Sequence, residues 1–213
     1  MLQLTRCALL LSIYLASLGQ AAELFVPITV NTSSISGTSG SIDLQFNPGP
    51  LVTQTADMMI VNFAGNGTLI PGAQLTGGVS GALPGSLTFN NSTAYNDYFQ
   101  DFTFGSTLSF TVVLYGPAVT SPNGTATSGS AFALSLFSDP AGTVPTLTTD
   151  TADGFTTVVN LNLNGGATVT NYSSQTTAGP VSTPEPGSFA LLLAVFGLLG
   201  ATRLVRARLV NVP

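Results

Sequence analysis

Carboxylates are the only strongly reactive side chains that the central part of this sequence offers. The chain has 213 residues and no histidine, and all four of its basic residues lie near the two ends, at Arg6, Arg203, Arg206 and Arg208. The single cysteine, Cys7, is also close to the N-terminus. Imidazole, amine and thiol catalysis, and metal sites built from His and Cys, are therefore excluded from the centre of the chain. The lack of Lys and Arg there also excludes a basic nucleic-acid-binding surface.

Two carboxylates can hydrolyse a glycosidic bond, and Asp97 and Asp101 come closest to such a pair. On a strand, residues four apart share a face but lie about 13 Å apart, beyond the separation that glycosidases use. The dipeptide Asn96-Asp97 also favours a turn. We therefore predict no catalytic residues and no enzyme activity, and an Asp97-dependent glycosidase is only the third hypothesis.

Calcium binding is the better use of oxygen ligands alone. Asp139, Asp150 and Asp153 could supply carboxylates from one end of a β-sandwich, although their spacing does not match an EF-hand loop. Asp139-Pro140 and Asp153-Gly154 are also turn-forming dipeptides. Turns are the preferred interpretation, a calcium site is the alternative, and no cofactor is predicted.

Aromatic residues gather between positions 95 and 104, where Tyr95 and Tyr98 could stack on sugar rings. The chain has no tryptophan, and the period-two spacing of Phe102 and Phe104 favours a place in the core. A carbohydrate-binding module is therefore the alternative function for this part of the chain.

The charge map also predicts how stability depends on pH. Because no carboxylate in the centre of the chain has a cationic side chain to pair with, like-charge repulsion should raise carboxylate pKa values in the folded state. Stability should then rise modestly as the pH falls from 7 to about 4.5. Turn hydrogen bonds at Asp139 or Asp153 would act in the opposite direction.

The elements that must position these residues are strands. Apolar and polar residues alternate in residues 41–46, 108–115, 132–137 and 155–163, which is the period of a half-buried strand. Further candidate strands are 24–32, 57–63, 74–79, 85–89, 98–104 and 167–172, separated by Gly-, Pro- and Asn-rich turns. No stretch has a sustained helical period. The sequence thus predicts an all-β domain at residues 23–177, an antiparallel β-sandwich of jelly-roll-like type.

Residues 1–22 have the three parts of a secretory signal peptide. Arg6 supplies the positive start, residues 8–18 form the apolar segment, and Ala21 and Ala22 provide small residues for cleavage. A retained membrane anchor is the alternative, but the apolar run is short for a span.

The C-terminal end has a linker at 178–187, an apolar segment at 188–205 and a basic tail at 206–213. A helix over residues 187–205 would be about 28 Å long, close to the roughly 30 Å thickness of a bilayer core. A buried core helix is the alternative, but Arg203, Arg206 and Arg208 argue against burial. The positive-inside rule places these arginines in the cytoplasm and the β domain outside.

The order of Pro184-Glu185-Pro186, an apolar helix and the cluster Arg203, Arg206 and Arg208 resembles the PEP-CTERM sorting signal of Gram-negative bacteria. The arginines are interrupted by Leu204-Val205 and Ala207, which departs from the usual pattern. The resemblance implies recognition by an exosortase, cleavage near the tripeptide, and passage from the inner membrane to the cell surface or the medium.

Residues 42–49 and 129–137 also resemble a group of PEP-CTERM proteins of undefined activity. We therefore expect an exported, non-enzymatic cell-surface or extracellular-matrix protein, with an exosortase, the inner membrane and extracellular polysaccharide as its candidate partners.

Overall fold

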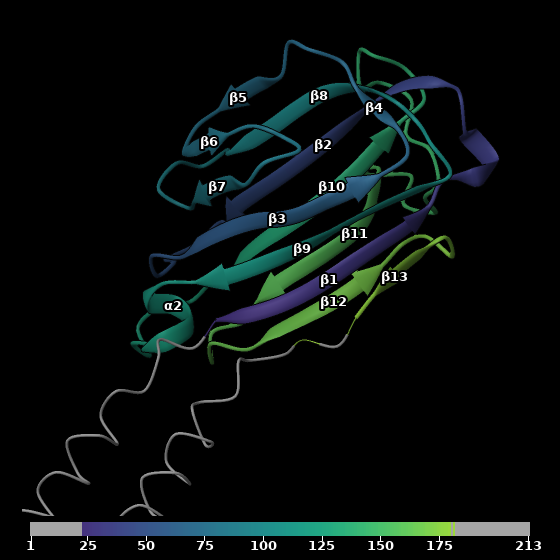
Figure 1. Ribbon diagram of the computed structural model, residues 1–213. Coiled ribbons are helices and arrows are strands. Elements are labelled where there is room, and N and C mark those ends of the chain that lie inside the picture. The colour runs from purple at the N-terminus through teal and green to yellow at the C-terminus, as the bar shows by residue number, and fades with distance from the viewer. Residues whose placement is uncertain (1–22, 180, 182–213) are drawn as a thin grey trace, which may run out of the picture. The chain divides into compact units, whose positions relative to one another are not determined.

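The alternating stretches form strands, and the prediction of an all-β domain is confirmed: the described residues form two antiparallel sheets (Figure 1). The computed structural model describes residues 23–179 and 181. Outside the strands, the helical elements described are a 3-10 turn at Ser33–Ile35 and the short helix α2 at Pro117–Thr120.

The first sheet has six strands. Their order is β13 (Thr176–Ala178), β1 (Leu24–Asn31), β9 (Thr107–Tyr115), β3 (Asp57–Gly65), β7 (Leu87–Asn90) and β6 (Val79–Gly81). Every neighbouring pair in this sheet is antiparallel.

The second sheet has seven strands in its described part. The order is β12 (Ala167–Asn171), β11 (Phe155–Leu161), β10 (Ser130–Phe137), β2 (Ser39–Pro48), β8 (Asp97–Thr103) and β4 (Thr68–Leu69). The strand β5 (Gln74–Thr76) also pairs with β8.

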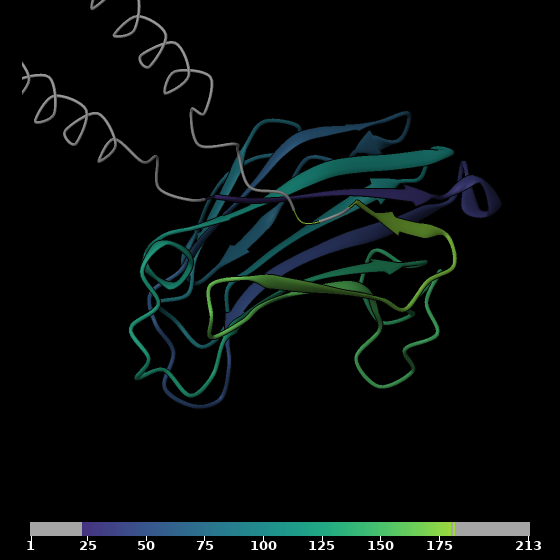
Figure 2. The ribbon, with the colours of Figure 1, turned by 90° about the horizontal axis from the view of Figure 1, so that it is seen from below.

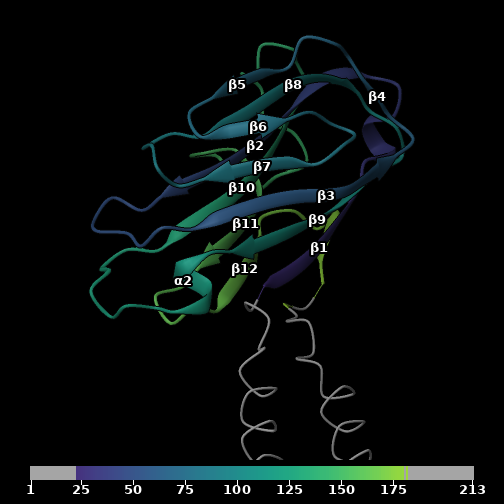
Figure 3. The ribbon, with the colours of Figure 1, turned by 60° about the vertical axis from the view of Figure 1, so that its left-hand side comes forward.

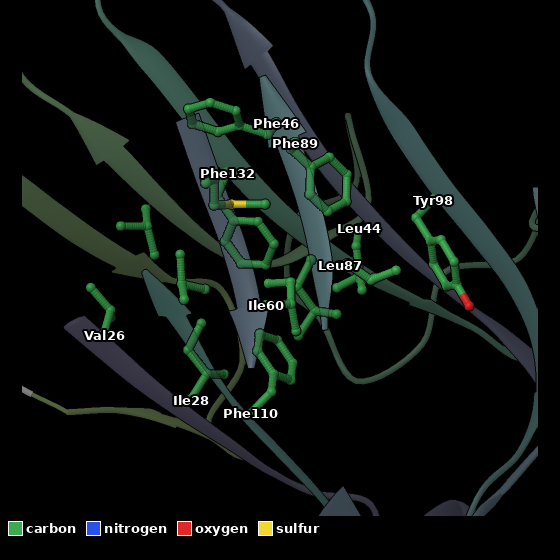
Figure 4. Close-up of a cluster of buried hydrophobic side chains, with 14 of the residues drawn as sticks. Val26, Ile28, Leu44, Phe46, Ile60, Leu87, Phe89, Tyr98, Phe110 and Phe132 are labelled. Atoms are coloured by element: carbon green, nitrogen blue, oxygen red, sulfur yellow. The ribbon is translucent and has the colours of Figure 1, made fainter. Parts of the chain in front are cut away.

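The core lies between the two sheets, as the two layers in Figure 2 indicate. Apolar residues at alternate positions of each strand point inward, including Val26 and Ile28 from the first sheet and Leu44 and Phe46 from the second (Figure 4). Phe110 on β9 meets Phe132 on β10 edge to face across the layers, with ring centroids 6.1 Å apart. Period-two alternation therefore divides each strand into a core side and an outward side.

Consecutive strands alternate between the sheets along much of the chain. β1 belongs to the first sheet, β2 to the second, β3 to the first, β4 and β5 to the second, β6 and β7 to the first, β8 to the second and β9 to the first. The chain then stays in the second sheet for β10, β11 and β12, and returns to the first as β13. This order brings residues far apart in the sequence onto common faces.

One predicted strand, residues 74–79, is two strands in different sheets. β5 ends at Thr76 and β6 begins at Val79, with Gly77 (φ +71°) and Gly78 between them. The left-handed conformation at Gly77 breaks the strand, since it departs from the extended backbone. The Gly78 amide then donates to Asn96 Oδ1 at 2.7 Å, which holds the break in place.

The domain ends slightly beyond its predicted boundary at residue 177. β13 includes Ala178, which is paired with Ile28 on β1, so the first residue of the predicted linker belongs to the sheet. The predicted strand 155–163 is shorter than expected, since β11 ends at Leu161 and Leu163 is 51% exposed.

Within residues 23–179, neither helical element has the length and apolar character that crossing a membrane requires. The predicted signal peptide (1–22), membrane segment (188–205) and basic tail (206–213) lie outside the described residues, as do Pro184, Glu185 and Pro186.

Candidate functional site

Two carboxyl groups meet on the outward face of the second sheet. Ile42 and Leu44 on β2 point into the core, so Asp43 between them points outward, and Asp97 on β8 points to the same side. The register pairs Gln45 with Asp97 and Asp43 with Phe99, which makes Asp43 and Asp97 diagonal neighbours. Their carboxyl groups are close enough for a hydrogen bond, which needs a proton on one of them.

This carboxyl pair, Asp43 and Asp97, is buried although it lies on an outward face. Each residue is only 8% exposed. Asp43 Oδ2 accepts a hydrogen bond from Gln45 Nε2 at 2.8 Å, but the Oδ1 atoms of both aspartates have no protein donor. A proton shared between the two groups would give these buried oxygen atoms a partner and remove the repulsion between two negative charges.

Tyr95 and the loop that follows β10 flank the carboxyl pair. The Tyr95 hydroxyl lies near Asp97 and Asp43, and burial together with their negative charges raises its pKa. Ser41, on the same face of β2, donates its hydroxyl to the Asp139 carbonyl at 2.9 Å. A Cβ at Gly142 would come 2.7 Å from the Phe99 ring, so this loop lies against the outward face beside the pair.

Burial raises the pKa of Asp43 to about 8, and both the hydrogen bond and the negative charge of Asp97 act in the same direction. Burial also raises the pKa of Asp97. The pKa of Tyr95 rises to about 12, first by burial and then by the charges of Asp97 and Asp43. Burial and mutual repulsion therefore both favour a proton on the carboxyl pair.

The structure does not gather the predicted calcium ligands into one site. In residues 23–179 there is no group of three carboxylates placed to hold a metal ion. The Asp139 carboxylate instead accepts the Val144 amide at 2.7 Å, and the Asp150 carboxylate accepts the Ala152 amide at 3.0 Å. Asp153 donates its own amide to Asp150 at 3.3 Å. The carboxylates of Asp139 and Asp150 therefore act as turn acceptors, and for Asp139 this is the role that the adjacent Pro140 favours.

The alternative in which Tyr98 stacks on a sugar beside Tyr95 is wrong. Tyr98 is completely buried, among the core side chains of Figure 4. Its hydroxyl donates to Gln100 Oε1 at 2.5 Å and accepts the Leu83 amide at 3.2 Å. Tyr95 is 47% exposed and keeps its ring at the surface.

Replacing Tyr98 with Phe is expected to lower the free energy of unfolding by about 1–3 kcal/mol, because the buried Gln100 oxygen and the Leu83 amide would lose their partner. Urea denaturation of the two proteins measures the difference. Tyr172→Phe, at a half-exposed position, is the matched control and should change little. Equal losses in the two variants would contradict the role of the Tyr98 hydroxyl.

Asp43 is the residue of the carboxyl pair that sequence spacing did not identify. Asp97 and Asp101 do share the outward face of β8, but the partner of Asp97 comes from β2, more than fifty positions earlier in the chain. An aspartate at an outward position of the alternating stretch 41–46, in a region without cations, was the available signal.

Comparison of the chain with protein-family models, with curated proteins and with solved structures found no match.

Proposed function

We propose that this protein is an exported, non-enzymatic component of the cell surface or extracellular matrix, sorted by a PEP-CTERM signal. The position of the fold between the two predicted sorting segments is the observation that carries the proposal. β1 begins at Leu24, just after the predicted cleavage residues Ala21 and Ala22, and β13 ends at Ala178, before Pro184. Removal of both segments would leave every described strand intact.

The composition of the domain supports export. Residues 23–179 contain no cysteine, so folding does not depend on the redox state of the compartment. They also contain no Lys, Arg or His, which gives an acidic surface rich in Thr, Ser and Asn. We interpret the alternation of strands between the sheets as jelly-roll wiring, a form that surface and lectin domains use.

The proposed route has two steps. Residues 188–205 hold the exported chain in the inner membrane, with Arg203, Arg206 and Arg208 on the cytoplasmic side. An exosortase then cuts near Pro184-Glu185-Pro186 and releases or transfers the β domain.

Intact-mass analysis of the protein from its host is expected to show loss of the first 21 or 22 residues and of the segment from about Pro186 onward. Glu185→Ala should abolish the second cut because it changes the tripeptide, whereas Pro180→Ala, in the same linker, should not. Recovery of only full-length C-termini from a host with an active exosortase would refute the proposal.

A carbohydrate-binding module is the second candidate function. The half-exposed ring of Tyr95 favours it, because aromatic faces at the surface pack against sugar rings.

A further inference from the structure

An open groove lies on the first sheet, formed by β9, β3, β7 and β6, which lie side by side in Figure 3. Its volume is about 410 Å³. The side chains that line it are mainly polar and include Asp57, Ser80, Thr88, Asn90 and Tyr115. A groove of this size accommodates a small ligand without enclosing it.

Three of these side chains form a single row across three strands. Asp57 on β3 is paired with Tyr115 on β9 and with Asn90 on β7. Met58, Leu114 and Phe89, next to them in sequence, belong to the core, so the three polar residues point outward together. Directly opposed residues have Cβ atoms about 5 Å apart, which places an aromatic ring, a carboxylate and an amide within reach of one small molecule.

Two glycines make room for this row. A Cβ at Gly78 would come 2.3 Å from Asn90 Oδ1, and a Cβ at Gly116 would come 2.9 Å from Asp57 Oδ2. Asn90 Oδ1 accepts the Ser92 amide at 3.1 Å, which orients the amide group. Within residues 23–179 the Asn90 Nδ2 donors have no protein partner.

The hydroxyl groups of Ser80 and Thr88 extend the polar lining. They are 2.6 Å apart across the pair β6–β7, and either can act as the donor. The groove thus offers a carboxylate that accepts hydrogen bonds, an amide that donates them and hydroxyls that do both.

The charge of the groove selects the class of ligand. No Lys, Arg or His occurs in residues 23–179, so no side chain of the domain can neutralise a phosphate, sulfate or uronate. An uncharged molecule with several hydroxyl groups suits the lining better, since its hydroxyls can donate to the carboxylate and its C–H faces can pack on an aromatic ring.

We propose that this groove binds a neutral carbohydrate, with Asp57 accepting sugar hydroxyls, Asn90 donating to a sugar oxygen, and the Tyr115 ring packing against a sugar face. The proposal takes its ligand class from the carbohydrate-binding candidate above, but it places the site on the outward face of the first sheet and not at the Tyr95 ring. It does not depend on export or processing.

The test uses the full chain in a detergent without sugar headgroups. Neutral gluco-, galacto- and manno-oligosaccharides of two to four residues are screened on an array, and the best binder is titrated by calorimetry. Asp57→Asn and Tyr115→Ala are each expected to weaken binding at least tenfold. Asp101→Asn, an acid outside the groove, should leave the affinity unchanged. Tyr95→Ala is measured beside it, to distinguish binding in the groove from binding on the Tyr95 ring.

The possible outcomes distinguish failure of the groove proposal from failure of the carbohydrate-binding candidate. Binding lost in Tyr95→Ala but kept in Asp57→Asn would overturn the groove proposal and leave the carbohydrate-binding candidate standing. No binding of any neutral oligosaccharide, or a preference for anionic ones, would overturn the groove proposal as well. Circular dichroism shows whether Tyr115→Ala folds. If it does not, the affinity is compared in the near-isosteric variants Asp57→Asn and Asn90→Asp instead.

Discussion

Raising the pH from 5 to 9 is expected to lower the thermal midpoint of this protein by about 6–12 °C, because the carboxyl pair Asp43 and Asp97 loses its shared proton. The folded-state pKa of Asp43 lies near 8 against the usual 3.8, so between these values the folded chain holds a proton that the unfolded chain has released. Stability is therefore fully present below about pH 4 and is lost as the pH rises towards 8. The pKa difference sets an upper limit of about 6 kcal/mol, of which about 4 kcal/mol falls between pH 5 and 9. Relaxation around the pair reduces the expected loss to about 3 kcal/mol.

Asp97→Asn isolates the contribution of the carboxyl pair. The asparagine amide can donate to Asp43, which removes the like charge and stabilises the remaining carboxylate. We expect this variant to lose at least half of the pH dependence and to exceed the wild type in stability at pH 9. Asp101→Asn, further along the same face of β8, should keep the wild-type slope. EDTA in every sample removes any contribution from metal ions, and a slope that survives in Asp97→Asn would contradict the assignment to the pair.

The second large effect is expected in the core, where Phe132→Ala should lower the free energy of unfolding by about 3–5 kcal/mol. Phe132 is completely buried and meets Phe110 across the two sheets, so its removal leaves a cavity between them. Urea denaturation measures the change. Phe132→Leu, which retains most of the buried volume, should cost clearly less, and Val144→Ala, at a side chain 52% exposed, should cost under about 0.5 kcal/mol. A loss in Phe132→Ala no greater than in Val144→Ala would show that the sheets do not share this core.

The pH prediction also gives the sequence-based expectation a specific cause. General repulsion among carboxylates predicted a modest gain in stability on acidification. In the structure, the gain in stability on acidification comes mainly from the buried carboxyl groups of Asp43 and Asp97. Asp139 and Asp150 act in the opposite direction, because their carboxylates accept backbone amides and these hydrogen bonds favour the ionised forms.

Period-two alternation was enough to predict most strands, because a strand between a core and a surface must alternate. The same alternation predicts that Tyr98 points into the core. Tyr98 has the same parity as Phe102 and Phe104, which had been assigned to the core, so it had to share their inward face, whereas Tyr95 did not. The short strands β4 and β13 have two and three residues, too few for a period to be visible.

Neither site could be predicted from spacing, because each depends on the register between distant strands. Asp43 meets Asp97 through the pairing of β2 with β8, and Asp57, Asn90 and Tyr115 meet through two pairings of β3. The alternation of apolar and polar residues indicates which face of a sheet a residue occupies, but it does not indicate which strand lies beside it. The split of residues 74–79 between two sheets has the same origin, since it depends on a distant acceptor, Asn96.

The edge position of β13 has a mechanical consequence. β13 is held to β1 by three residue pairs, whereas β1 is joined to β9 by eight. Tension applied to the chain beyond Gly179 would act on the β13–β1 ladder from its Ala178 end and open these few pairs one after another. A protein tethered through that end could therefore lengthen by releasing one short strand, while the strands that carry the carboxyl pair and the groove remain folded under load.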